Sequence, residues 1–292
     1  MKIRLIYFFG FLVLLAAVIL LAIFSFPDQK LHLIFCDVGQ GDAILVVRGS
    51  TQALIDGGPD NKVLGCLAKH LPFWDKKLEL VILTHPEPDH LTGLVSVAES
   101  YQIKQLVANS LVLESGAFEE FRQTIIKKKT PVFTPKAGDK IRISGLAFNV
   151  LFPKEKLGNE IVWHKPEGYR VLGLSSYTGN FNQTALVTEL SFGKFQALLT
   201  GDIGAEEEAQ IAPVPVEVLK VGHHGSKYSS SKEFLEKIKP ALAVISVGAA
   251  NRYGHPTPEV LGRLKELGIK VLRTDLDGEV EIISDGRSWE VR

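Results

Sequence analysis

The chain has 292 residues, a length that fits one large domain or two small ones. Hydrophobic residues make up 46% of it and charged residues 23%, so it has enough apolar material for a core and the charge content of an ordinary globular protein. Basic and acidic residues balance at 33 each, which argues against a function that depends on general electrostatic attraction to nucleic acid.

The first segment, Leu5–Phe26, is an uncharged and mostly apolar run that follows Lys2 and Arg4. As a helix it would span about 33 Å, enough to cross the hydrocarbon core of a bilayer. No small-residue cleavage site follows this long run, which favours an uncleaved transmembrane helix over a signal peptide. The preceding basic residues predict that residues 27–292 lie outside the cytoplasm. We expect an anchor with a short linker in residues 1–30 and one domain in residues 31–292.

The rest of the chain alternates short apolar or β-branched runs with amphipathic segments. Three strands at the start predict a meander, and strands and helices follow in alternation. The expected strands cover Leu31–Cys36, Ala43–Arg48, Gln52–Ile55, Leu78–Leu83, Gln105–Ala108, Lys140–Ile143, Ala147–Phe152, Thr184–Ser191, Phe195–Leu199, Val216–Val221, Ala241–Val247, Val271–Arg273 and Val280–Ile283. The expected helices cover Lys62–Leu71, Leu91–Ser100, Ala117–Lys128, Ala205–Ile211, Ser231–Ile238 and Pro258–Leu267. This order predicts an α/β sandwich with sheets inside and helices outside.

Two further features bear on the domain. Cys36 falls in an apolar strand and Cys66 in an expected helix, so both are interpreted as buried small hydrophobic residues rather than as a disulfide. Residues 153–181 show little periodicity and predict a long loop with a functional role, because structureless loops of this length are uncommon in compact domains.

The densest group of metal-ligand side chains is the run His85-Pro-Glu87-Pro-Asp89-His90, which follows the apolar segment Leu80–Leu83. Imidazoles and carboxylates held this close together are costly without a cation to neutralise them. The run therefore predicts a metal site, although Asp89 could instead cap the following helix.

Other expected strands also end in residues of this kind: Asp56, Asp202, the pair His223-His224, and the loop that carries His255. Strands that end at one edge of a sheet deliver such residues to a common crevice. Asp202 is favoured as a ligand over a helix cap, and either His223 or His224 could be the ligand. Asp56 could orient a ligand or only form a turn. Asp37, Gln40 and Asp42 are expected to hold a glycine-rich turn near the site.

These residues resemble the metallo-β-lactamase superfamily and, within it, the hydrolase domain of ComEC-type competence DNA-uptake proteins. The family's metal signature HxHxDH, or HxDxDH in the competence branch, stands here as His85-x-Glu87-x-Asp89-His90. The match spans about residues 31–284 in the family's order. Its other motifs are Asp37-Val-Gly-Gln-Gly-Asp42, Asn182-Gln-Thr184-Ala-Leu-Val, Leu199-Thr-Gly-Asp202, His223-His-Gly-Ser226 and Tyr253-Gly-His255-Pro.

The resemblance implies a four-layer αββα sandwich, after the transmembrane helix, with one or two divalent ions at the sheet edge. It places His85 and Glu87 on a first ion and Asp89 and His90 on a second, with Asp202 between them. One of His223 and His224 would be a further ligand. The resemblance implies catalytic roles for Asp89, His224 and His255, the last as a ligand or a proton donor. Two such ions share a hydroxide and stabilise charge on the attacking and leaving oxygens.

The sequence departs from the superfamily pattern at two positions. Glu87 stands where the superfamily has His and the competence branch has Asp, and the histidine expected before Asp202 is not evident, since only His164 lies in that interval. A site poor in imidazole and rich in carboxylate favours harder ions such as manganese or magnesium over zinc.

The leading hypothesis is a membrane-anchored, metal-dependent phosphodiesterase, a nuclease acting on DNA outside the cytoplasm. The neutral charge of the chain weakens the choice of DNA. One alternative is hydrolysis of another ester, such as a phosphocholine ester or a lactone. Another is a catalytically silent binding module tethered to the membrane. No protein partner is evident in the sequence.

Overall fold

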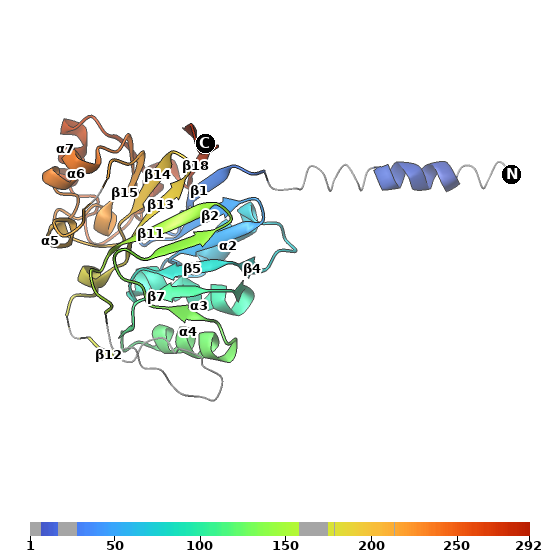
Figure 1. The fold of residues 1–292 in the computed structure, drawn as a ribbon, viewed down its shortest axis with the longest axis horizontal. Coiled ribbons are helices and arrows are strands. Elements are labelled where there is room, and N and C mark those ends of the chain that lie inside the picture. Colours follow the sequence, from blue (N-terminus) through green and yellow to red (C-terminus); the bar gives the residue numbers. More distant parts are fainter. Residues whose placement is uncertain (1–6, 17–27, 158–174, 178, 213) are drawn as a thin grey trace.

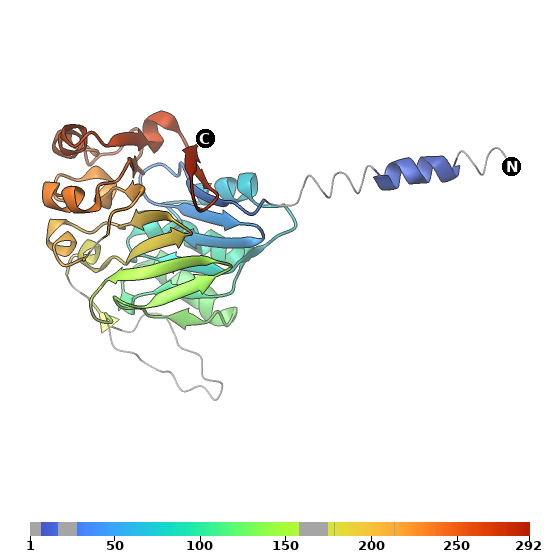
Figure 2. The same cartoon turned by 45° about the horizontal axis from the view of Figure 1, so that its top comes forward.

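The computed structural model describes residues 7–16, 28–157, 175–177, 179–212 and 214–292. Two large β-sheets pack face to face in the centre, and helices cover their outer faces (Figures 1 and 2). This is the αββα sandwich that the sequence predicts.

The first sheet contains the meander and the strands that follow it. Its strand order is β19-β18-β1-β2-β3-β5-β7-β9, in which β3, β5, β7 and β9 run parallel. The strands are β1 (Leu31–Phe35), β2 (Ile44–Arg48), β3 (Thr51–Ile55), β5 (Leu80–Leu83), β7 (Leu106–Ala108), β9 (Val132–Phe133), β18 (Val280–Ser284) and β19 (Trp289–Val291). Two further short strands, β4 (Lys77–Leu78) and β6 (Gln102–Ile103), pair with each other in a separate two-stranded sheet.

The second sheet has the order β10-β11-β13-β14-β15-β16-β17, and its last four strands are parallel. The strands are β10 (Lys140–Ile143), β11 (Leu146–Phe152), β13 (Val187–Phe192), β14 (Phe195–Leu199), β15 (Val218–Lys220), β16 (Leu242–Ile245) and β17 (Lys270–Arg273). Short strands β8 (Leu111–Val112) and β12 (Ser175–Ser176) also pair. The carboxyl ends of the parallel strands in each sheet point to one edge, and residues at such an edge can converge.

Three apolar clusters separate the layers. The cluster between the sheets contains residues such as Phe35, Ile82 and Phe148. A second cluster lies between the first sheet and helices α2 (Lys62–His70), α3 (Pro88–Ser100) and α4 (Gly116–Lys127). A third lies under α6 (Lys232–Ile238) and α7 (Pro258–Glu266). The helices α5 (Ala205–Glu208) and α8 (Thr274–Asp277) are single turns.

Some boundaries differ from the sequence predictions. Helix α3 begins at Pro88 rather than Leu91, so Asp89 and His90 stand in its first turn and not in a loop. Proline is suited to this first helical position, because it has no N–H to leave unpaired there. The helix expected over Ala205–Ile211 ends at Glu208, and the short strands β9 and β19 were not predicted. Residues 158–174, most of the predicted functional loop, lie outside the described residues, and so does His164.

The prediction of two unbridged cysteines was wrong. Cys36, at the end of β1, and Cys66, on α2, form a disulfide inside the cluster beneath that helix. Both are buried as the sequence suggested, but the packing of α2 across the first sheet brings their Cα atoms to 5.9 Å, within the range for a bridge.

The predicted anchor Leu5–Phe26 lies mostly outside the described residues. Residues 7–16 are helical, and their large apolar side chains are exposed. Among the residues that the structure describes, no helix is long and apolar enough to cross a membrane.

Candidate metal centre

The carboxylate of Asp56 organises the ends of two parallel neighbours, β3 and β5. Asp56 follows β3, and its Oδ1 accepts a hydrogen bond from the Thr84 backbone N–H at 2.8 Å. Its Oδ2 accepts from Thr84 Oγ1 at 2.6 Å and from His90 Nδ1 at 2.8 Å. All three groups are buried. Asp56 therefore orients a predicted ligand, which is the more specific of the two roles considered from the sequence.

Three imidazoles are held in one tautomer by these and similar contacts. His90 Nδ1 donates to Asp56, and His224 Nδ1 donates to the carbonyl of Ser246 at 2.8 Å. The Thr84 hydroxyl gives its proton to Asp56, so it accepts from His85 Nδ1 at 3.0 Å. In each neutral ring the remaining nitrogen, Nε2, then carries a lone pair. Each Nε2 atom is buried without a hydrogen-bond partner.

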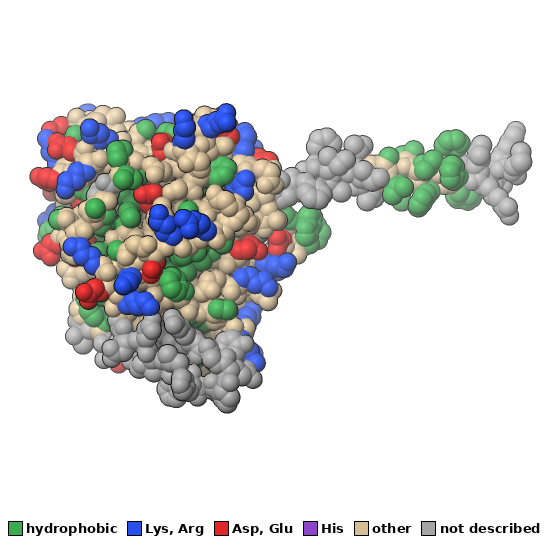
Figure 3. Space-filling model, in the orientation of Figure 1, with side chains coloured by type: hydrophobic (Ala, Val, Ile, Leu, Met, Phe, Trp, Pro, Cys, Tyr) green, Lys and Arg blue, Asp and Glu red, His purple; other side chains and the backbone are tan. Residues whose placement is uncertain are grey.

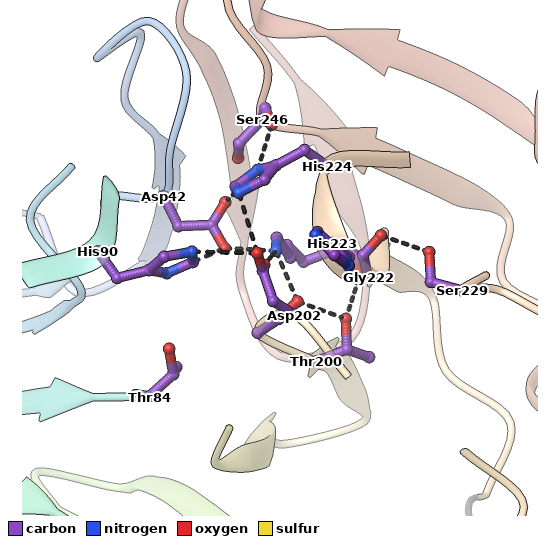
Figure 4. Close-up of polar contacts among 12 residues, drawn as sticks. Asp42, Thr84, His90, Thr200, Asp202, Gly222, His223, His224, Ser229 and Ser246 are labelled. Atoms are coloured by element: carbon purple, nitrogen blue, oxygen red, sulfur yellow. Dashed lines mark hydrogen bonds and ion pairs between the residues drawn. The ribbon is translucent and has the colours of Figure 1, made fainter. Parts of the chain in front are cut away.

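Two of these Nε2 atoms, on His90 and His224, face the carboxylate of Asp202 (Figure 4). Oδ2 of Asp202, which follows β14, lies 3.1 Å from His224 Nε2 and 3.3 Å from His90 Nε2. Oδ2 of Asp89 lies 3.4 Å from His224 Nε2. Acceptors this close repel unless a cation or a proton lies between them.

The donor set fits a divalent ion. One ligand atom from each of Asp89, His90, Asp202 and His224 lies within 4.8 Å of the others. Two carboxylates and two imidazoles are ligands that manganese and zinc both accept. These four residues would hold the ion, which when bound would polarise a phosphoryl or carbonyl oxygen and lower the pKa of a water molecule.

Electrostatics within the group agree with this. Burial lowers the pKa of His224, but the carboxylates of Asp202 and Asp42 outweigh it and raise the pKa to about 10. The pKa of His90 is likewise raised well above its usual value, against burial, by Asp202 and Asp56. The pKa of Asp89 is lowered because the positive charges of His90 and His224 overcome burial. The cluster therefore attracts positive charge to the point between its ligand atoms.

The buried ammonium of Lys220 is a part of the site that the sequence analysis missed. Lys220 ends β15 and is fully buried. Its Nζ donates to Asp202 Oδ1 at 3.2 Å, to the carbonyl of Gly201 at 2.7 Å, and also contacts Asp42 Oδ2. Asp202 thus accepts a hydrogen bond from Lys220 with Oδ1, while its Oδ2 faces the imidazoles of His90 and His224. The one signal in the sequence was a lysine in the otherwise apolar end of a strand.

The glycine-rich turn predicted around Asp42 packs against the start of α3. Asp42 N–H donates to the carbonyl of Asp89 at 3.1 Å, and a Cβ at Gly41 would come within 2.2 Å of that carbonyl oxygen. Gln40 joins the turn to the second sheet by accepting from the backbone N–H of Gly248 at 3.2 Å. Asp42 has the further role of pairing with Lys220, which the sequence did not indicate.

The remaining predicted residues surround the four-residue group. His85 is buried beside it, with Nε2 3.9 Å from Oε2 of the half-buried Glu87. His223 is not among the four clustered ligand residues, and its Nε2 lies 3.4 Å from Nδ2 of Asn182. Both His223 and His224 have positive φ angles, 47° and 52°, and this left-handed turn directs the two rings differently. The structure thus brings His224, and not His223, to the other ligands.

His255 lines the open side of the site. It shares a cavity of about 570 Å³ with Glu87, Asp89, His224 and Tyr253. Burial and the charges of His224 and His223 lower the pKa of His255 to about 4. The ring is therefore neutral at pH 7 in the absence of a substrate, whereas the proton donor considered from the sequence would have to be protonated.

Comparison with known proteins identifies the class. The family model of the metallo-beta-lactamase superfamily matches residues 36–249, and this range contains every residue of the four-residue group. The chain belongs to this superfamily, and it is a metal-dependent hydrolase by fold and site.

Among curated proteins, the chain is similar to competence and recombination proteins. It is 32% identical to ComE operon protein 3 of Bacillus subtilis over 70% of this chain and 24% of that protein. It is 28% identical to Recombination protein 2 of Haemophilus influenzae over 94% of this chain and 31% of that protein. Identity to competence protein ComA of Neisseria gonorrhoeae is 26%, over 91% and 35%. The chain is a ComEC-type member of the superfamily and spans about a quarter to a third of these relatives.

A solved structure supports the fold independently. The metallo-beta-lactamase fold protein YhfI of Bacillus subtilis superposes with a TM-score of 0.54 at 11% identity, covering 86% of this chain and 99% of that one. At this identity the likeness concerns the arrangement of the two sheets and their helices.

Proposed function

We propose that the chain is a membrane-anchored phosphodiesterase that hydrolyses DNA outside the cytoplasm with one divalent ion held by Asp89, His90, Asp202 and His224. The observation that carries the proposal is the convergence of the His90 and His224 Nε2 atoms on two carboxylates. His85 and Glu87 lie beside this group and could take part in holding a second, weaker ion.

The choice of DNA draws on the relatives, which are named for competence and recombination. The extracytoplasmic location is supported by two features of this chain. The apolar run Leu5–Phe26 follows basic residues. The disulfide between Cys36 and Cys66 is typical of an oxidising compartment.

The protein's own groups have separate tasks. Asp56 and the Ser246 carbonyl keep the ligand imidazoles in the tautomer that offers Nε2. Lys220 holds Asp202. Asn182 and the neutral His255 line the cavity, where they can donate hydrogen bonds to phosphate oxygens or to the leaving group.

The test is hydrolysis by the purified full chain in detergent. With manganese, we expect cleavage of single- or double-stranded DNA and of bis(nitrophenyl) phosphate, and at least a thousandfold loss in the Asp89→Ala, His90→Ala variant. Glu99→Ala is the matched control, because Glu99 is exposed at the other end of the same helix. Turnover of bis(nitrophenyl) phosphate without DNA cleavage would keep the phosphodiesterase and reject the nuclease. Equal activity in all variants would reject both.

A further inference from the structure

An exposed aromatic pair stands on the loop between α2 and β4. Phe73 is 82% exposed and Trp74 is 60% exposed, and their rings touch edge to face with centroids 4.8 Å apart. Single exposed apolar residues are common on protein surfaces. Two large aromatic rings side by side, outside all three apolar clusters, indicate instead a surface that meets an apolar partner.

This loop lies at the end of the domain where the chain enters from the N-terminal segment. The carbonyl of Asp28 accepts from the N–H of Gly49, in the turn between β2 and β3, at 3.0 Å. At the start of β3, the amide of Gln52 donates to Asp75, next to Trp74, at 2.9 Å. Figure 1 shows the loop between α2 and β4 on the same side of the domain as the blue chain that enters β1.

The apolar run Leu5–Phe26 ends directly before Asp28. A bilayer that holds this run must therefore lie against the end of the domain that carries Phe73 and Trp74. Tryptophan is enriched at the boundary between hydrocarbon and headgroups, because its ring is largely apolar while its N–H can remain hydrated.

The charges around the pair suit an anionic lipid surface. Lys76 and Lys77 follow Trp74 and are exposed, and Lys104 is exposed on the neighbouring chain, where its N–H donates to the carbonyl of Leu78. The acidic residue nearest the pair, Asp75, already accepts from Gln52. In Figure 3 hydrophobic, basic and acidic side chains are all exposed on this side of the domain. Lysines close to a bilayer are attracted to anionic headgroups.

We propose that Phe73 and Trp74, flanked by Lys76 and Lys77, form a second membrane contact that docks the domain on an anionic bilayer. This inference rests on the anchoring proposed above. The contact would fix how the domain is oriented on the membrane. The contact lies at the amino ends of the parallel strands β3 and β5, and the ligands Asp89 and His90 follow the carboxyl end of β5. A strand the length of β3 spans roughly 17 Å, so the metal centre faces away from the membrane.

The test uses the full chain in nanodiscs of phosphatidylcholine and phosphatidylglycerol whose acyl chains carry bromine, a quencher of tryptophan fluorescence. We expect the tryptophan fluorescence of the native chain to be weaker in nanodiscs with brominated lipid than in nanodiscs with the same lipid without bromine. In Trp74→Ser we expect this difference to be lost. Leu276→Ser is the control, because Leu276 is 71% exposed on α8, after β17. Equal quenching in the native chain and Trp74→Ser would overturn the proposal. So would dimers in detergent that depend on Phe73 and Trp74, because these would assign the pair to a second copy.

Two other measurements test the membrane anchor and the hydrolase activity separately from this contact. Flotation of the full chain with vesicles tests the anchor, and we expect the Phe73→Ser, Trp74→Ser variant to float as well as the native chain. Failure of both to float would reject the anchor and the contact together. Turnover of bis(nitrophenyl) phosphate in detergent tests the hydrolase, and we expect it to be unchanged in this variant. Loss of turnover there would contradict the separation between contact and site.

Discussion

At the scale of single residues, the site is built from groups that constrain one another. Asp56 and the Ser246 carbonyl fix which nitrogen of His90 and of His224 is free. Lys220 occupies one oxygen of Asp202 and leaves the other for the imidazoles. A ligand atom in a metal site must be both unprotonated and correctly aimed, and here both conditions depend on partners behind the ligands.

Removing the Lys220 charge should affect both the stability of the fold and the affinity of the site for metal. In Lys220→Met, the buried Asp42 loses its closest counter-ion, so we expect a loss of about 3–5 kcal/mol in the free energy of unfolding. We also expect manganese to bind about 10–100-fold more weakly, since Asp202 is no longer held.

The matched variant is Asp42→Asn with Lys220→Met, in which both charges are gone. Urea denaturation should show that most of the stability returns, while calorimetric titration should show that the metal affinity does not. Native manganese affinity in Lys220→Met would mean that the lysine does not position Asp202.

Metal binding should release protons. In the metal-free protein the pKa of His224 is about 10, against an ordinary value of 6.5, so the ring is protonated at pH 7 and must lose its proton to bind an ion. Affinity for manganese should therefore rise as the pH increases from 7 to 9. Calorimetric titration in two buffers with different ionisation enthalpies measures the protons released. A binding enthalpy that is the same in both buffers would contradict this expectation.

At the scale of elements, the ligands depend on how closely α3 approaches the first sheet. Gly93 on α3 lies against the loop after β3, where a Cβ would come within 1.9 Å of the carbonyl oxygen of Gly57. This contact sets the distance between the first sheet and the helix turn that carries Asp89 and His90. The glycine allows close packing between backbones, which a sequence pattern of apolar residues does not reveal.

Replacing Gly93 with alanine should push α3 away from the sheet. We expect a loss of about 3 kcal/mol or more in the free energy of unfolding, together with loss of metal binding. Gly65→Ala on α2 is the control, because a Cβ there meets nothing within 4 Å, and alanine should stabilise that helix by about 0.5–1 kcal/mol. Thermal unfolding and metal content measure both effects. Native metal content in Gly93→Ala would show that the distance of α3 from the sheet does not determine whether its ligands bind the metal.

At the scale of the whole molecule, the first sheet and α2 are joined covalently. The disulfide between Cys36 and Cys66 closes a loop with a sequence separation of 30 residues and lies in the apolar cluster under the helices. It links the strand that leads to Asp42 with a helix on the outer layer. A disulfide limits the unfolded chain more than the folded one, so it should contribute to stability rather than to chemistry.

We expect the Cys36→Ala, Cys66→Ala variant to lose about 3–4 kcal/mol in the free energy of unfolding, as loop-closure entropy predicts for this separation. Urea denaturation measures the loss. A reducing agent should destabilise the native chain by a similar amount and leave the variant unchanged. Equal sensitivity of both chains to the reductant would show that the bridge is not formed in solution.

Local patterns were sufficient for most of the elements. Short runs of apolar or β-branched residues predict the central strands, and the expected helices α2, α4, α6 and α7 lie near their observed bounds. Edge elements such as β9 and β19 were missed because short strands contain few residues from which to detect a period. The start of α3 was misplaced because two prolines around Glu87 suggest a loop, although one of them is a favourable first helical residue.

The sequence by itself determined the types of ligand, their order along the chain and, through its motifs, the superfamily and the sandwich. These are properties of neighbouring residues and of strand ends. Only the tertiary structure decided that His224 rather than His223 joins Asp89, His90 and Asp202, that Lys220 pairs with Asp42, and that Cys36 meets Cys66. The reason is physical: these contacts join residues far apart in the chain, and their geometry is set by how two sheets and their helices pack.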